Sequence, residues 1–168
     1  MLYQVGALQA MAAGAGHRVT LVKLHGALAN MAQVDDELAG GVARAIRQLD
    51  RDLVFLVMPG MATERAGEKA GLRMAREIYA DRAYGEDGNL APRKSEGSVI
   101  HDTATATRRV LQMLDEQAVR TLGGQKLSAR IDSISVHSDT PDAVAMARAL
   151  RAALEHHGAR IAPFSSFV

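Results

Sequence analysis

The sequence has 168 residues, of which 48% are hydrophobic and 23% are charged; its formal net charge is +1 and it has no cysteine. This length predicts a single domain over residues 1–168 with a real core. The absence of cysteine excludes disulfides, a thiolate nucleophile and a Cys-based zinc site. Acidic and basic residues are interleaved along the chain, which argues against a protein that binds nucleic acid. No apolar run approaches the roughly 18 residues that span a bilayer. Residues 1–15 lack the basic start of a signal peptide, so we expect a cytoplasmic protein without a membrane partner.

The first part of the chain predicts alternating helices and strands. Residues 2–15 predict a helix, because apolar side chains recur about one turn apart before two glycines. A strand is expected over residues 18–24. Residues 34–49 predict an amphipathic helix with two acidic residues at the positive end of its dipole. The continuous apolar run at residues 53–58 is typical of a strand buried on both faces of a parallel sheet.

The rest of the chain continues this alternation. The expected elements are a helix over 61–70, a strand over 72–79, a polar loop over 84–92, a helix over 102–117, a strand over 131–136, a helix from 140 to 157 and a short strand over 160–162. Asp102 is the expected cap of its helix, and Thr140 with Pro141 opens the last one. Because hairpin signals are few, the pattern predicts an α/β fold with a parallel sheet covered by helices.

Polar side chains follow three of the expected strands, where active sites of parallel α/β folds lie. Lys23 and His25 are two residues apart, so an extended segment directs both to one side, where they could polarise a carbonyl or move a proton. The alternative is a solvated strand end. Gly26 would let the backbone approach a ligand closely.

Two further clusters are candidates for the same edge of the sheet. His137 and Asp139 could form an orienting pair or share a ligand, although Asp139 could equally cap the next helix. Asp81, Arg82 and Arg93 could bind a carboxylate or phosphate, although Asp81 and Arg82 could equally pair locally. No Gly-rich nucleotide loop is present in the sequence, so any ATP would be carried by a partner.

These motifs resemble one known family. The segment KLHGALAN at residues 23–30 is similar to the KPHGALYN segment of the LamB/YcsF family. Further similar segments follow in order along nearly the whole chain, at residues 76–84, 87–88, 92–93, 99–102 and 136–144. The sequence departs from the family pattern at Leu24, Ala29 and Ser138, each of which could alter a loop at a strand end.

The resemblance implies a parallel-stranded, barrel-like (β/α) fold. It matches the C-terminal two-thirds of the family's chains, so we expect an incomplete barrel in which the N-terminal strands are missing. Exposed strand edges and apolar surface would then favour an oligomer.

The resemblance also implies an activity, the ATP-coupled cleavage of the lactam 5-oxoproline to glutamate, carried out with partner subunits B and C. On that interpretation Lys23 steadies phosphate or carboxylate charge, and His25 and His137 handle protons, with Asp139 as a further catalytic candidate. The substrate-binding candidates are Asp81, Arg82, Arg93 and Asn30, with Arg82 holding the substrate carboxylate. ATP is the implied co-substrate, and no metal ligand is assigned.

Two alternatives stay open. The chain could be a truncated or divergent, non-catalytic paralogue that binds a small molecule or a partner protein, as the three departures would allow. It could instead resemble metal-dependent deacetylases, although the family's N-terminal acidic and histidine motifs are not present in this sequence.

Overall fold

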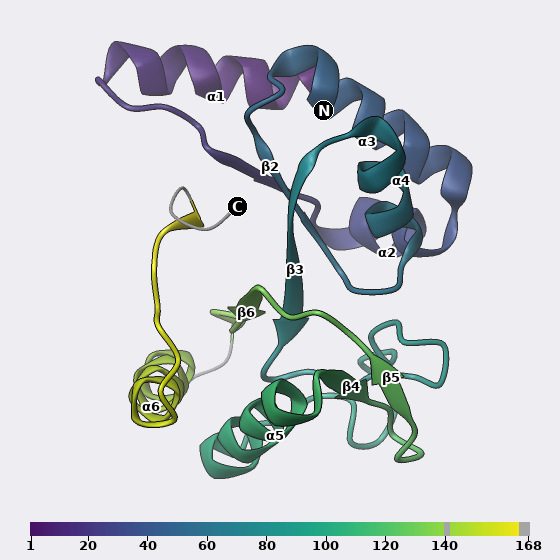
Figure 1. Ribbon diagram of the computed structural model, residues 1–168, viewed down its shortest axis with the longest axis vertical. Helices are drawn as coiled ribbons and strands as arrows, with labels where there is room; N and C mark the ends of the chain where they lie inside the picture. The colour runs from purple at the N-terminus through teal and green to yellow at the C-terminus, as the bar shows by residue number, and fades with distance from the viewer. Residues whose placement is uncertain (140–141, 165–168) are drawn as a thin grey trace. The chain divides into compact units, whose positions relative to one another are not determined.

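The structure is a computed structural model that describes residues 1–139 and 142–164 (Figure 1). The chain groups into two compact units. Unit 1 consists of residues 1–76 together with Phe164, and unit 2 of residues 77–163. Strand β3 (Arg73–Tyr79) contributes its first half to unit 1 and its second half to unit 2. The single domain over 1–168 stays a prediction.

Unit 1 is built on a parallel sheet. Strand β2 (Val54–Val57) pairs in parallel with β1 (Leu21–Lys23) on one side and with the first half of β3 on the other. Phe55 and Val57 belong to one apolar cluster, whereas Val54 and Leu56 belong to another, so β2 is buried on both faces. The predicted α/β class and the doubly buried strand are therefore confirmed.

Three helices cover one face of this sheet: α2 (Gly26–Val34), α3 (Asp36–Leu49) and α4 (Ala62–Ala70). Asp35 caps α3, since its carboxylate accepts the backbone N–H groups of Glu37 and Leu38 at 3.0 and 2.9 Å. Helix α2 was not predicted. The sequence pattern predicted a single helix from residue 34, whereas the extended backbone of Asp35 separates two helices there.

The first helix, α1 (Leu2–Gly14), matches its prediction in extent but not in packing. Val5 packs against the core of unit 1, whereas Leu8 and Met11 are 55% and 74% exposed. The repeat of apolar residues was sufficient to indicate a helix. It did not indicate which of those residues are buried in this structure.

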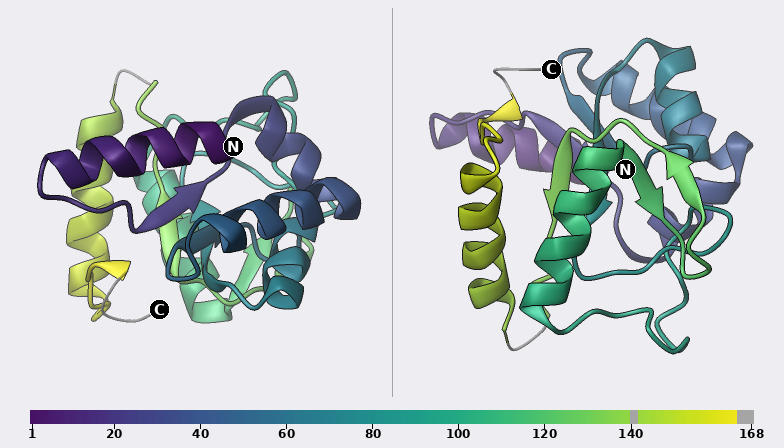
Figure 2. Two further views of the ribbon diagram at one scale, coloured as in Figure 1. Left: turned by 90° about the horizontal axis from the view of Figure 1, so that it is seen from above. Right: turned by 60° about the horizontal axis from the view of Figure 1, so that its bottom comes forward.

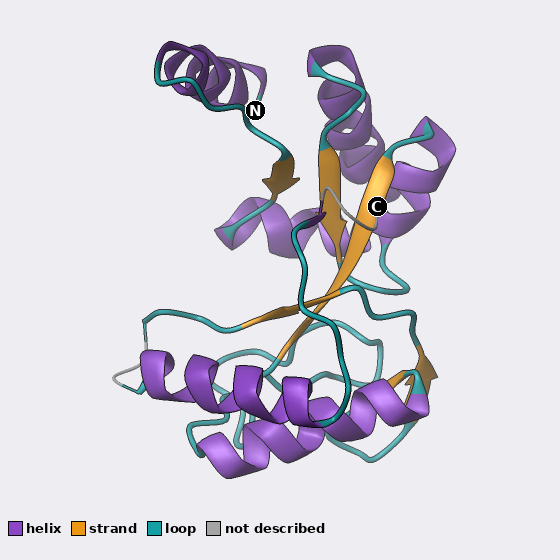
Figure 3. Ribbon diagram, turned by 60° about the vertical axis from the view of Figure 1, so that its left-hand side comes forward, coloured by secondary structure: helices purple, strands orange, loops and turns teal. Residues whose placement is uncertain are grey.

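Unit 2 contains the second half of β3, which pairs in parallel with β6 (Ser133–Ser135), so that Ile78 lies opposite Ile134. Helices α5 (Thr103–Glu116) and α6 (Ala143–His156) lie side by side (Figure 3). Asp102 caps α5 as predicted, accepting the backbone N–H of Thr105 at 2.7 Å. Strands β4 (Ala118–Arg120) and β5 (Lys126–Ser128) form an antiparallel hairpin directly after α5 (Figure 2).

Several details of unit 2 differ from the sequence predictions. The β4–β5 hairpin was missed, although its turn contains two glycines and Gly124 has a positive φ of 86°. The short strand expected over residues 160–162 is wrong, because that segment is irregular. The helix start expected at Thr140 and Pro141 lies outside the described residues. In residues 1–139 and 142–164, no helix has the length and apolar character needed to cross a membrane.

Candidate functional site

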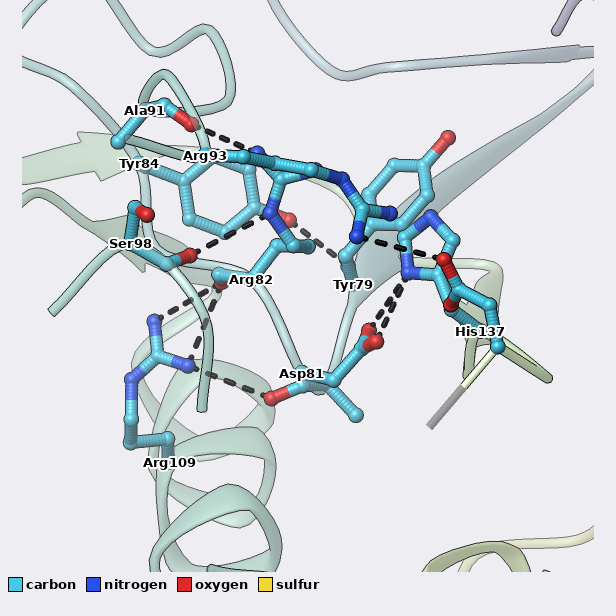
Figure 4. A network of polar contacts seen from close by, with 11 residues as sticks. Tyr79, Asp81, Arg82, Tyr84, Ala91, Arg93, Ser98, Arg109 and His137 are labelled. Atoms are coloured by element: carbon cyan, nitrogen blue, oxygen red, sulfur yellow. Dashed lines mark hydrogen bonds and ion pairs between the residues drawn. The ribbon is translucent and has the colours of Figure 1, made fainter. Parts of the chain in front are cut away.

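A buried carboxylate meets an imidazole where β3 and β6 end (Figure 4). Asp81 follows β3 by two residues and is 2% exposed, and His137 follows β6 by two residues. The Nδ1 atom of His137 lies 3.0 and 2.8 Å from the two carboxylate oxygens of Asp81. Because the strands are parallel, their carboxyl ends bring these two side chains together, although 56 residues separate them in sequence.

An aromatic ring lies against the imidazole of this pair. Tyr79, the last residue of β3, stacks on His137 with ring centroids 5.4 Å apart and an interplanar angle of 20°. Burial, together with the charge and hydrogen bond of Glu77, raises the pKa of Tyr79, so its phenol stays protonated at neutral pH. The backbone N–H of Tyr79 donates to the hydroxyl of Tyr84 at 2.8 Å.

Arg82 fixes the loop that follows Asp81. Its buried guanidinium donates from Nη2 to the carbonyl of Ala91 at 2.6 Å and from Nε to the carbonyl of Ser98 at 3.3 Å. Burial, followed by the charge of Arg93, lowers the pKa of Arg82. These hydrogen bonds hold the two sides of the loop together behind the Asp81–His137 pair.

A second arginine supports the same loop from α5. Arg109 lies 3.4 Å from the carbonyl oxygens of Ala80 and Arg82, and its burial lowers its pKa. The carbonyl of Asp81 accepts the backbone N–H of Ile100 at 2.9 Å. The backbone on both sides of the Asp81 carboxylate is therefore tied down, which is the support that a functional side chain needs.

The more exposed part of the site carries an ion pair. Nη1 of Arg93 lies 3.3 Å from Oδ2 of Asp139, and the two side chains are 50% and 59% exposed. Arg93 and Asp139 both influence the pKa of Arg82, so the three charges are close neighbours. An exposed guanidinium with one long ion pair is available to an incoming carboxylate or phosphate.

The amino-acid sequence matches the LamB/YcsF family profile over residues 1–168. The chain belongs to the LamB/YcsF family. It is 49% identical over 163 residues to the A subunit of 5-oxoprolinase from Rhodopseudomonas palustris strain BisB5, a match that covers 97% of this chain and 64% of the relative. A relative of the same name from Nitrobacter hamburgensis is 47% identical over 164 residues, with 98% and 64% covered.

A solved structure is similar as well. The crystal structure of a lactam utilization protein from Thermus thermophilus is 41% identical and superimposes with a TM-score of 0.86, covering 97% of this chain and 65% of that chain. The present LamB/YcsF chain spans about 64% of the length of the curated relatives it matches. Because those relatives are named as one lettered subunit of an enzyme, their names imply a multi-subunit complex.

The LamB/YcsF site pairs its residues differently from the sequence prediction. The two-residue spacing paired His137 with Asp139, whereas His137 is bonded to Asp81 and Asp139 pairs with Arg93. The residue preceding α6 is Asp142, so Asp139 is not its cap. The suggested local pairing of Asp81 with Arg82 is replaced by hydrogen bonds from Arg82 to backbone carbonyls. Spacing of two residues is visible in sequence, but the pairing of β3 with β6 is not.

The other candidates lie in unit 1. Lys23 is the partly buried last residue of β1, and His25 is exposed and extended immediately before α2. Gly26 has a positive φ of 60°, a conformation that favours glycine, and Asn30 is exposed on α2. Lys23, His25 and Asn30 all belong to unit 1, and their role in a site stays a prediction.

Three residues of the site were missed by sequence reasoning: Glu77, Tyr79 and Arg109. Glu77 and Tyr79 precede Asp81 at intervals of two along one strand face, a pattern that could have drawn attention to them. Arg109 gave no signal, since it is one basic residue on an amphipathic helix. Among residues 1–139 and 142–164, no three His, Asp or Glu side chains are grouped so that they could hold a metal ion.

Proposed function

We propose that this chain acts as the A subunit of an ATP-dependent 5-oxoprolinase, which cleaves 5-oxoproline to glutamate together with partner subunits B and C. The proposal is supported by the relatives of that name and by the lactam utilization protein of similar structure. The observation that carries it is the pairing of His137 with the buried Asp81 carboxylate at the carboxyl ends of two parallel strands. A barrel-like fold and an oligomeric assembly belong to the same proposal.

The chemistry requires a group that moves protons. Water adds its oxygen to the lactam carbonyl carbon, the ring C–N bond breaks, and the ring nitrogen gains a proton to become the amine of glutamate. His137 would take the proton of the attacking water and return it to the leaving nitrogen. Asp81 would orient the imidazole and stabilise its protonated form, as the carboxylate of a catalytic triad does.

A lactam is a stabilised amide, which is why ATP is part of the proposal. Transfer of the γ-phosphoryl group of ATP to the amide oxygen would release ADP and make the ring carbon more electrophilic. After water has added and the ring C–N bond has broken, hydrolysis of the resulting acyl phosphate by a second water would release phosphate and glutamate. Since this chain has no Gly-rich phosphate loop, we assign nucleotide binding to the partner subunits. Lys23 would steady the phosphate or carboxylate charge, and His25 would be a second proton-handling group.

The substrate also carries a carboxylate, and Arg93 is an exposed cation beside the Asp81–His137 pair. Its exchange of Asp139 for the substrate carboxylate would replace one exposed ion pair by another. The buried guanidinium of Arg82 would add positive charge near the substrate carboxylate, while its N–H groups hold the loop through the carbonyls of Ala91 and Ser98. Asn30 remains a substrate-binding candidate by family resemblance.

The test is glutamate release from 5-oxoproline and ATP by this chain mixed with purified B and C subunits. His137→Asn should lower the rate by about 10²-fold or more, the usual contribution of general acid–base catalysis. The matched control is His157→Asn, which alters an exposed histidine bonded to Asp115 at 2.9 Å. That variant should retain the rate of the unmodified chain.

The carboxylate has a matched control of its own. Asp81→Asn should lower glutamate release, whereas Asp115→Asn should not, because the second aspartate belongs to the exposed pair. Absence of glutamate release, beside a working full-length relative mixed with the same B and C subunits, would overturn the proposal. A non-catalytic protein that binds a small molecule or a partner would then be the better interpretation.

A further inference from the structure

The imidazole of His137 is held by two different residues, and each limits a different freedom of the ring. We infer that Tyr79 is a positioning residue which, together with Asp81, holds His137 as its Nδ1–H tautomer and presents Nε2 as the nitrogen that exchanges protons with substrate. The tautomer and the orientation follow from contacts within unit 2. The assignment of Nε2 to the reaction rests on the proposed function.

The contact with Asp81 sets the tautomer. A neutral imidazole has one N–H, and a carboxylate can only accept. Both Asp81 oxygens lie within 3.0 Å of Nδ1, so the neutral ring places its proton there and its lone pair on Nε2. Because Asp81 is buried and its loop is tied down by Arg82 and Arg109, this acceptor is fixed.

The contact with Tyr79 limits the tilt of the ring. A hydrogen bond at Nδ1 alone lets the imidazole swing about that contact, whereas an aromatic face stacked at 20° leaves one plane for it. Tyr79 is itself fixed, because it is the last residue of β3 and its backbone N–H donates to the hydroxyl of the fully buried Tyr84. His137 is therefore supported from the end of β3 on two sides.

This arrangement assigns the role to the ring of Tyr79 and not to its hydroxyl. Burial and the charge of Glu77 raise the pKa of Tyr79 and keep the phenol protonated, and its hydrogen bond is directed to Glu77. Phenylalanine would preserve the stacked face, whereas leucine would fill part of the space without an aromatic plane. The pair Tyr79→Phe and Tyr79→Leu thus separates stacking from hydroxyl chemistry.

The first experiment does not depend on catalysis. Long-range ¹H–¹⁵N correlation spectra of the histidine-labelled chain report the tautomer of each neutral imidazole, and His137→Asn assigns the signal. We expect the Nδ1–H tautomer for His137 in the unmodified chain and in Tyr79→Phe. In Tyr79→Leu the ring can tilt away from Asp81, which weakens the contact that keeps the proton on Nδ1, so a mixture of tautomers should appear while the His157 signal stays unchanged. If the leucine variant does not fold, Tyr79→Met replaces the ring by another flexible apolar chain.

The second experiment measures kinetics with subunits B and C. Tyr79→Phe should keep kcat within about two-fold, whereas Tyr79→Leu should lower kcat by about 10- to 100-fold, since small misplacements of a reacting group are costly. KM should change little, because Tyr79 acts through His137. A His137 imidazole that stays entirely in the Nδ1–H tautomer in the leucine and methionine variants overturns the inference. A changed spectrum in a chain without glutamate release leaves the positioning in place and overturns the proposed reaction.

Discussion

The two units differ in what they bury. In the described part of unit 1, the buried polar side chains are Gln33 and Thr63, which bond to each other at 2.8 Å. Unit 2 buries charged residues as well, namely Glu77, Asp81 and Arg82, close to the ends of β3 and β6. Since burying charge is costly unless it is partnered, unit 1 is the region shaped by apolar packing and unit 2 the region shaped by a site.

Strand β3 shows the same contrast within seven residues. Ala75 belongs to an apolar cluster of unit 1, whereas Glu77 and Tyr79, on the same face of the strand, lead into the polar site of unit 2. The change occurs toward the carboxyl end of a parallel strand, where α/β folds place their chemistry. One strand can therefore contribute to a core and to a candidate site in succession.

The largest effect expected from this comparison is on the apolar core of unit 1. Phe55 is fully buried in the middle of β2, so Phe55→Ala should lower the free energy of unfolding by about 3–5 kcal/mol. Urea denaturation measures the loss, and Phe55→Leu is the milder control. A loss below about 1 kcal/mol would contradict the view that unit 1 depends on apolar packing.

Arg82 gives the next largest effect, and Arg93 is its matched control. Arg82→Met should destabilise the chain by about 2–3 kcal/mol, because the carbonyls of Ala91 and Ser98 lose charged donors. Arg93→Met removes only an exposed ion pair and should cost less than about 1 kcal/mol. If urea denaturation shows that both variants lose the same free energy of unfolding, the buried and exposed arginines do not differ in their contribution to stability.

Two glycines of unit 1 should respond with opposite signs. Gly71 follows α4 with a positive φ of 62°, so Gly71→Ala should cost about 1–2 kcal/mol. Gly14 ends α1 with nothing within 4 Å of the place that an alanine methyl would take, so Gly14→Ala should stabilise by up to about 1 kcal/mol. Thermal or urea denaturation measures both, and stabilisation by Gly71→Ala would be inconsistent with the left-handed backbone there.

Sequence reasoning predicted most of the fold from local patterns. The apolar run of β2 and the capped helices α3 and α5 carry their signals within a few residues, and all three were found. Helix α2 was missed because its exposed apolar residues form no clear stripe. The β4–β5 hairpin was missed because its strands are three residues each.

The site was predictable in composition but not in pairing. Asp81, Arg93, His137 and Asp139 were all singled out, because each follows a predicted strand or lies in its loop. Their partners could not be predicted from spacing, since the β3–β6 pairing joins residues that are 56 apart. A two-residue interval favoured Asp139 as the partner of His137, and tertiary structure provided Asp81 instead.

The smallest expected effect concerns an ion cluster that ties the hairpin of unit 2 to α5. The Glu116 carboxylate lies 2.6 Å from Nη2 of Arg120 and 3.0 Å from Nζ of Lys126, and the hydrogen bond from Arg120 is the main cause that lowers its pKa from 4.5 to about 2. A lowered folded-state pKa means that this stabilisation is present above the unfolded value and is lost as the pH falls toward the folded one. The stability difference between the unmodified chain and Glu116→Gln should therefore shrink between about pH 5 and about pH 3.

Urea midpoints across that range measure the change. Glu155→Gln, which removes an exposed pair with Arg151 on α6, controls for the loss of a surface carboxylate. A difference independent of pH would mean that Glu116 has the same proton affinity in the folded and unfolded chain. The hairpin would then be held by its backbone pairing and apolar contacts. The stabilising charged interactions that distinguish unit 2 from unit 1 would be limited to the region around Asp81 and His137.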